Sequence, residues 1–201
     1  MSKIKVLIAD DHEIVRKGLR ELINQQSDMQ VISEAVDGED AIQMVQEYSP
    51  DIILMDVVMP KMNGIDATRK IKSQFPHTRI IALSIYADRS YVIQMFKMGV
   101  SGYLLKESAF NELIKAIRKA LNNQVHLSHL LYKGVYLEFK TIMKKNETKD
   151  LEILNEKEQI ILKRLAEADT IKEISETMNI PFNIVESIVE GILNKWMLIN
   201  K

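Results

Sequence analysis

Residues 51–64 read DIILMDVVMPKMNG, and this stretch decides the fold. An apolar run, residues 52–55, leads straight into the acidic residue Asp56, and Pro60 and Gly64 then indicate a turn. A short run rich in Ile and Leu that ends at turn residues is typical of a strand buried on both faces. A carboxylate at the end of such a strand therefore calls for a functional explanation.

Four further apolar runs resemble the one that ends at Asp56, and amphipathic helical patterns separate them. The further runs cover residues 5–9, 30–36, 79–84 and 102–106. The helical patterns cover residues 13–25, 39–48, 65–75, 90–99 and 111–121. Strict alternation of strand and helix predicts an α/β fold with a doubly wound, five-stranded parallel sheet. This first domain is expected to span residues 1–122.

Polar side chains stand where the predicted strands end. Asp10 and Asp11 follow the first strand, Asp56 the third, Ser84 the fourth and Lys106 the fifth. The carboxyl ends of parallel strands meet at one edge of the sheet, and ligands bind there at the point where the strand order reverses. We therefore expect three carboxylates, one hydroxyl and one ammonium group to meet in a single site.

The residue types at this edge favour phosphoryl chemistry. Three close carboxylates repel one another unless a cation compensates for their charge, and Mg²⁺ prefers oxygen ligands of this kind. A carboxylate held near the cation can attack a phosphoryl donor and become an aspartyl phosphate. Lys106 would neutralise the developing negative charge, and Ser84 would donate a hydrogen bond to a phosphoryl oxygen.

Three segments carry a resemblance to a known family: VLIADDHEIVRKGL (6–19), DIILMDVVMPKMNGID (51–66) and GVSGYLLKES (99–108). They resemble the flavodoxin-like receiver domain of two-component response regulators, and the first is similar to the NarL/FixJ type. The resemblance implies that a sensor histidine kinase phosphorylates Asp56. It also implies a phosphorylated homodimer.

The resemblance assigns further roles by position. The implied ligands of Mg²⁺ are Asp11, Asp56 and the backbone carbonyl of Val58, with Asp10 acting partly through water. The implied switch and phosphate-binding residues are Ser84, Tyr103 and Lys106. Phosphohydrolases that form an aspartyl phosphate carry a second Asp at the position of Val58, so a stand-alone enzyme is disfavoured. We expect only autophosphotransfer and slow dephosphorylation.

The second half of the chain divides into an expected linker, residues 123–153, and a small all-α domain, residues 154–201. The linker ends in polar and charged residues, although apolar residues near its start indicate that part of it packs. Three helical patterns follow, at 155–168, 170–178 and 182–198. Asn155 with Glu158, and Thr170 with Glu173, have the spacing of capping boxes. Short helices joined by short turns predict a helix-turn-helix.

The last three helical patterns resemble the LuxR-type output domain, whose final helix enters the DNA major groove. The candidate DNA-contacting residues are Asn183, Glu186, Ser187, Glu190 and Lys195. Two of them are acidic, where the family carries basic side chains, and the family adds a helix beyond the position of Lys201. The output domain is therefore predicted to be divergent and short. Two hypotheses stand: a DNA-binding transcription regulator, or a receiver whose helix-turn-helix acts through protein contacts.

Composition bounds the function further. The chain of 201 residues has 27 Lys/Arg against 28 Asp/Glu, and residues 148–201 alone hold seven against ten. This acidic excess is unlike the basic face of most nucleic-acid binders. There is no cysteine, which excludes disulfides and Cys-ligated zinc. No long apolar window or signal peptide is evident, so a cytoplasmic protein without a membrane partner is expected.

Overall fold

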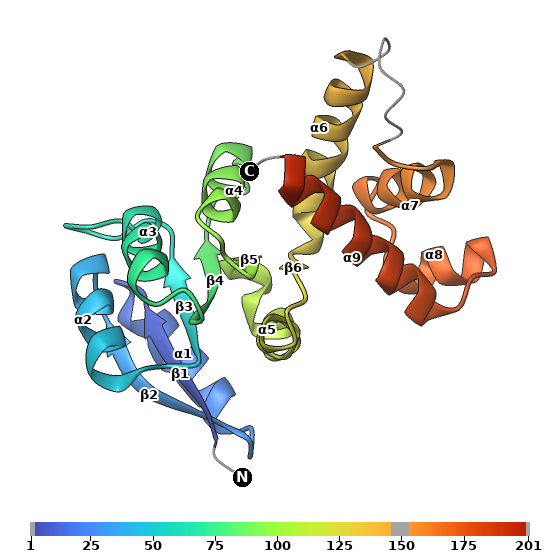
Figure 1. Ribbon diagram of the computed structural model, residues 1–201. Coiled ribbons are helices and arrows are strands. Elements are labelled where there is room, and N and C mark those ends of the chain that lie inside the picture. The colour runs from blue at the N-terminus through green and yellow to red at the C-terminus, as the bar shows by residue number, and fades with distance from the viewer. Residues whose placement is uncertain (1–2, 146–152, 200–201) are drawn as a thin grey trace. The chain divides into compact units, whose positions relative to one another are not determined.

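The computed structural model describes residues 3–145 and 153–199, and the chain divides into two compact units, Met1–His126 and Leu127–Lys201 (Figure 1). The first unit is an α/β domain and the second is helical. Each unit is built around its own set of buried apolar side chains.

The first unit contains the predicted parallel sheet. Its principal strands are β1 (Ile4–Ala9), β2 (Met29–Ala35), β3 (Ile52–Asp56), β4 (Arg79–Ser84) and β5 (Gly102–Leu105). They lie in the order β2-β1-β3-β4-β5 and pair in parallel. The order reverses between β1 and β3, and this confirms the doubly wound arrangement expected from the alternating pattern.

A sixth strand extends the sheet beyond the five predicted. β6 (His126–Leu127) lies beside β5, and the backbone N–H of His126 donates to the carbonyl of Ser101 at 3.3 Å. The expected count of five strands was therefore one short. A two-residue strand has no periodic pattern of its own, so only its pairing with β5 defines it.

Helices cover both faces of the sheet. They are α1 (Glu13–Asn24), α2 (Gly38–Tyr48), α3 (Gly64–Gln74), α4 (Arg89–Lys97) and α5 (Lys106–Leu121). α1 and α5 pack on one face, and α2 and α3 pack side by side on the other, with α4 next to α3. Leu19 and Ile23 of α1 meet Leu113 and Ile117 of α5 in a core against the strands.

The second unit begins inside the segment that was expected to be a linker. Residues His129–Leu131 form the 3-10 turn η1, and Tyr132–Lys145 form helix α6. Leu131, Val135 and Phe139 are buried at four-residue spacing, and α6 packs on α7. The expected linker, residues 123–153, thus contains a packed helix because these apolar residues share one helical face. Its charged stretch, residues 146–152, lies outside the described residues.

Three more helices complete the second unit: α7 (Glu156–Ala166), α8 (Ile171–Met178) and α9 (Phe182–Ile199). Both predicted capping boxes are confirmed, with Asn155 and Glu158 at the start of α7 and Thr170 and Glu173 at the start of α8. α9 packs against α7 and α8. The helices α8 and α9 are joined by a short turn in which Asn179 adopts a left-handed conformation, with φ of 51°.

Candidate phosphoryl-transfer site

The strand register brings the predicted acidic residues together. Ala9 of β1 lies opposite Met55 of β3, so the residues that follow them, Asp10 and Asp56, are neighbours at the carboxyl edge of the sheet. Ser84 likewise lies opposite Leu105, the residue that precedes Lys106. Asp10, Asp56 and Ser84 are all buried. The predicted convergence of strand ends on one site is therefore seen in the structure.

Lys106 joins two of these carboxylates. Its Nζ lies 2.6 Å from Oδ2 of Asp56 and 2.7 Å from Oδ2 of Asp10. Burial by itself lowers the pKa of Lys106, but the hydrogen bonds to Asp10 and Asp56 more than offset burial, so the pKa is raised above its ordinary value. Lys106 therefore remains a cation in the centre of the site.

Asp56 is held in an environment that disfavours its charge. Burial raises the pKa of Asp56 above its ordinary value, and the hydrogen bond from Lys106 lowers it only in part. The nearby charge of Asp10 raises it further. The backbone N–H of Val58 donates to Oδ1 of Asp56 at 3.3 Å. A carboxylate with this environment is stabilised when an additional cation enters the site.

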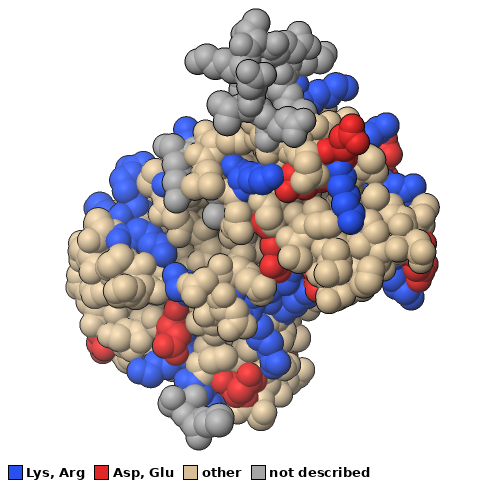
Figure 2. Space-filling view, turned by 45° about the vertical axis from the view of Figure 1, so that its right-hand side comes forward, with Lys and Arg blue, Asp and Glu red and all other residues tan. Residues whose placement is uncertain are grey.

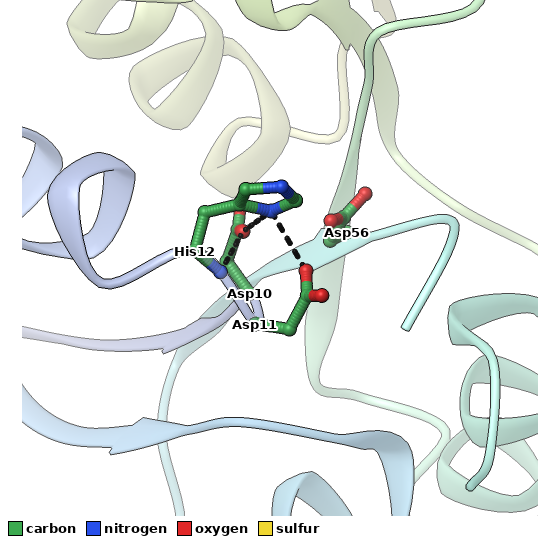
Figure 3. Close-up of side chains that lie close together, drawn as sticks. All are labelled: Asp10, Asp11, His12 and Asp56. Carbon is green, nitrogen blue, oxygen red and sulfur yellow. Dashed lines mark hydrogen bonds and ion pairs between the residues drawn. The ribbon is translucent and has the colours of Figure 1, made fainter. Parts of the chain in front are cut away.

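A pocket of about 180 Å³ opens beside Asp56. Its lining residues are Asp11, His12, Asp56, Val58, Ser84, Ile85, Tyr86 and Lys106. Figure 3 shows Asp10, Asp11 and His12, from the loop after β1, facing Asp56 at the end of β3. Ligand atoms of these four residues all lie within 4.8 Å of one another, so the group can hold a metal ion.

Ser84 and Tyr103, two of the three residues implied as a switch, both bond to the backbone of Tyr86. Tyr86 donates its backbone N–H to Oγ of Ser84 at 3.0 Å, and the hydroxyl of Tyr103 donates to the carbonyl of Tyr86 at 3.1 Å. Tyr103 is fully buried, and burial raises its pKa to about 12. Tyr103 lies inward in this structure because the backbone of the β4–α4 loop supplies a partner for its hydroxyl.

The turn after Asp56 explains two residues of the opening stretch. A Cβ atom at Gly64 would lie 1.9 Å from the carbonyl oxygen of Asp56, so only glycine permits this close approach. Lys61 follows Pro60 in a left-handed conformation, with φ of 57°, and its ammonium contacts Asp37 at 2.7 Å. The turn is thus fixed to the start of α2, next to the site.

One supporting residue was missed in the sequence. Arg16 of α1 is mostly buried, and its guanidinium donates to the carbonyl of Asp10 at 2.7 Å and to Glu34 at 3.0 Å. Arg16 thereby fixes the backbone that presents the acidic pair. Arg16 is the fourth residue of α1, and this position was the available signal, because side chains near the start of a helix tilt toward its N-terminus and so toward the strand end that precedes it.

The candidate DNA-contacting residues lie along α9 but differ in their surroundings. Asn183 and Ser187 are exposed, whereas Glu186 and Glu190 are half-buried. Lys195 was expected to offer a cation to DNA. Its Nζ instead lies 2.7 Å and 2.8 Å from the two carboxyl oxygens of Glu158 on α7, so its charge is already compensated.

The donor set fits Mg²⁺. One oxygen each of Asp10 and Asp56 is taken by Lys106, and the remaining oxygens of these residues and of Asp11 are available in the same small space. Hard oxygen donors with room for water are what Mg²⁺ requires. Val58 belongs to the pocket lining, and its carbonyl would complete the set suggested by the sequence.

A doubly wound sheet with buried aspartates and a lysine at its switch point defines a receiver, the signalling class in which an aspartate is the phosphoacceptor. The chain belongs to the response regulator receiver domain family, whose model matches residues 6–118. It is a response regulator, as the resemblance implied.

Relatives and solved structures extend this likeness beyond the receiver. The chain is 35% identical to the oxygen regulatory protein NreC of Staphylococcus aureus (strain JH9), over 98% of this chain and 93% of that protein. It is 31% identical to the transcriptional regulatory protein DegU of Brevibacillus brevis, over 96% of this chain and 88% of that protein. These matches span both units, so the alternative of a helix-turn-helix that acts through protein contacts is not favoured.

A LuxR-family response regulator from Aurantimonas sp. SI85-9A1 superposes with a TM-score of 0.66 at 32% identity, over 69% of this chain and 99% of that one. The RcsB response regulator of Salmonella typhimurium shares the fold, with a TM-score of 0.61 at 24% identity, over 98% of this chain and 93% of that one. Within the residues described, no helix has the length and apolar character needed to cross a membrane.

Proposed function

We propose that Asp56 accepts a phosphoryl group from a phosphohistidine of a sensor histidine kinase, and that the helical unit then controls transcription by binding DNA. The single observation that supports this best is the contact of Lys106 with two buried carboxylates, Asp10 and Asp56, at the switch point of the sheet. These three groups suit a site that accepts one phosphoryl group. They lack the additional acid that a phosphohydrolase needs at the position of Val58.

The transfer follows from the charges in the pocket. A carboxylate oxygen of Asp56 attacks phosphorus, the P–N bond to the donor histidine breaks, and the electron pair leaves on the imidazole nitrogen. Lys106 then exchanges its contact with the carboxylate for one with a phosphoryl oxygen. Mg²⁺ held by Asp11, Asp56 and the Val58 carbonyl would supply positive charge to the phosphoryl oxygens.

Ser84 and Tyr103 would transmit the new charge. A phosphoryl oxygen near Oγ of Ser84 competes with the backbone N–H of Tyr86 for that hydroxyl. Loss of this bond would release the β4–α4 loop, and Tyr103 is bonded to the same residue of the loop. The chain's response would thus be a shift of a pre-existing equilibrium at the α4, β5 and α5 surface.

Acetyl phosphate with Mg²⁺ tests the site without a kinase. We expect one phosphoryl group per wild-type chain, none in Asp56→Asn, and weaker Mg²⁺ binding in Asp11→Ala. Phosphorylation is measured by intact-protein mass spectrometry, and Mg²⁺ binding by calorimetry. Asp51→Asn is a control because Asp51 lies at the opposite end of β3. Labelling of Asp56→Asn at the wild-type level would overturn the assignment.

The output step rests on the likeness of the second unit to transcription regulators. DNA affinity needs cations, and the exposed ones in the described part of this unit include Lys163 on α7 and Lys172 on α8. On the face shown in Figure 2, Lys and Arg lie interspersed with Asp and Glu. Binding through so mixed a surface would be helped by a second subunit, which doubles the number of phosphate contacts.

Phosphorylation is expected to make two chains associate into a dimer. Identical chains associate through self-complementary surfaces about a twofold axis. Light scattering on free and phosphorylated protein distinguishes monomer from dimer. A protein concentration on the order of tens of micromolar is suitable for an interface of modest size. An unchanged monomer mass after full phosphorylation would contradict the dimer.

A further inference from the structure

His12 lies at the centre of the acidic pocket although the proposed magnesium site does not use it. Nδ1 of His12 is 2.8 Å from Oδ1 of Asp11 and 3.2 Å from Oδ1 of Asp10. The backbone N–H of His12 also donates to Oδ1 of Asp10 at 2.9 Å, which fixes the ring's starting position. Figure 3 shows the ring nitrogen directed at both carboxylates, on the side that faces Asp56.

The two distances from Nδ1, which are those of hydrogen bonds, are also compatible with shared coordination of a metal ion. In an octahedral site with bonds of about 2.1 Å, adjacent ligand atoms are about 3.0 Å apart. The two separations from Nδ1, 2.8 Å and 3.2 Å, lie on either side of that value. An ion bound to these atoms would replace the present hydrogen bonds and would require little movement of the side chains.

The carboxylates are oriented for this arrangement by Lys106. Its ammonium contacts Oδ2 of Asp10 and Oδ2 of Asp56, so Oδ1 of Asp10 is the oxygen that faces His12. The side chain of His12 is 62% exposed, so once an ion is bound the ring proton can reside on Nε2 and bond to water. Nδ1 then presents a lone pair to the pocket.

We propose that Nδ1 of His12 is a metal ligand of this pocket and makes it select divalent transition ions over Mg²⁺. This inference rests on the proposed magnesium site and adds one nitrogen donor to its oxygen donors. Mg²⁺ gains little from imidazole, whereas affinity for nitrogen-containing sites rises from Mn²⁺ to Co²⁺. The ligand class is therefore a first-row divalent ion that accepts both carboxylate and imidazole.

Metal titrations test the selectivity directly. Calorimetry with Mg²⁺, Mn²⁺ and Co²⁺ on wild-type protein is expected to give rising affinity in that order. His12→Phe keeps a planar ring but has no donor atom, and the Co²⁺ to Mg²⁺ affinity ratio should fall by about tenfold or more, since even outer-sphere partners are worth that much. His77→Phe, at an exposed loop position, is the matched control and should leave the ratio unchanged.

Pulsed EPR of bound Mn²⁺ detects a nitrogen ligand directly in the wild-type protein. Wild-type protein should show coupling to a directly bound nitrogen, with the pattern altered by ¹⁵N-histidine labelling and lost in His12→Phe. An unchanged affinity ratio in His12→Phe, or Mn²⁺ bound without nitrogen coupling, would overturn the inference and leave the magnesium site standing. Failure of any divalent ion to bind, or binding unaffected by Asp11→Ala, would overturn the magnesium site as well.

Discussion

The ammonium group of Lys106 lies 2.6 Å from Oδ2 of Asp56, fifty residues away in the sequence. This contact keeps a cation against the phosphoacceptor candidate before any metal or phosphoryl group is present. It does not fully compensate the carboxylate, because burial and the charge of Asp10 raise the pKa of Asp56. The negative charge of Asp56 is therefore unfavourable in this environment, and binding of a cation would stabilise it.

Removing that charge should stabilise the first unit. In Asp56→Asn, without Mg²⁺ and at neutral pH, we expect the melting temperature to rise by a few degrees, at about 4 °C for each kcal/mol in a domain of this size. Circular dichroism or calorimetry measures it. Glu21→Gln, an exposed position on α1, is the control and should change nothing. A lower melting temperature in Asp56→Asn would show that the pair with Lys106 outweighs the burial of the carboxylate.

The stability advantage of Asp56→Asn over the wild-type protein should increase with pH. The folded state binds a proton at Asp56 more tightly than the unfolded state does, because its folded pKa is raised above the ordinary 3.8. Below that ordinary value both states are protonated and the variant has no advantage. The advantage appears as pH rises through the folded pKa and stays constant above it.

The lifetime of the phosphorylated form should be set by Val58 and Tyr86. Both line the pocket and are exposed, and neither carries a carboxylate or amide that could orient an attacking water. We expect a lifetime on the order of tens of minutes, because orientation of a nucleophile is worth several kcal/mol of barrier. Loss of phosphate from purified protein in Mg²⁺ measures it.

The variants Val58→Asn and Tyr86→Glu should shorten that lifetime. Val36→Asn is a matched control, since Val36 is 45% exposed and Val58 44%, but Val36 is absent from the pocket lining. A wild-type half-life of seconds, or variants no faster than wild type, would show that other residues control hydrolysis.

DNA binding should depend on Lys172 and not on Lys195. Lys172 is 78% exposed, and its contact with the exposed carboxyl of Glu176 is long, at 3.9 Å, so DNA phosphates can replace it. Lys172→Met should therefore weaken binding and reduce the slope of log affinity against log salt by about one. Lys195→Met should leave the slope unchanged and instead destabilise the helical unit by about 1–2 kcal/mol, since Glu158 loses its partner. Gel shifts at several salt concentrations and thermal melts separate the two effects. No binding by wild-type protein, phosphorylated or free, would favour output through protein contacts.

Helix α6 should be needed for the packing of α9. Nε1 of Trp196 donates to Oε2 of Glu138 at 2.8 Å, and both side chains are buried. Glu138→Ala should cost about 2 kcal/mol, as for other buried bonds to acidic groups. Trp196 is the sole tryptophan of the chain, so its fluorescence should shift to the red and report earlier unfolding in denaturant. Glu167→Ala, at an exposed site on the neighbouring turn, should behave as wild type.

The sequence by itself determined the receiver fold and the meeting of Asp10, Asp56 and Lys106. Alternation of apolar runs and helical patterns specifies a parallel sheet, and a parallel sheet places every strand's carboxyl end at one edge. The two capping boxes were likewise predictable, because both partners lie within one helical turn. These features depend on neighbours in the chain or on the direction of strands.

Only the tertiary structure decided which groups act on one another at that edge and in the helical unit. The structure contains the strand β6, and part of the expected linker forms helix α6. Lys195 pairs with Glu158, and the side chain of Tyr103 lies inward. Nδ1 of His12 is also directed at two aspartates. Each of these depends on side-chain direction or on a partner far along the chain. Periodicity fixes which face a residue occupies, but packing alone fixes which atom it meets there.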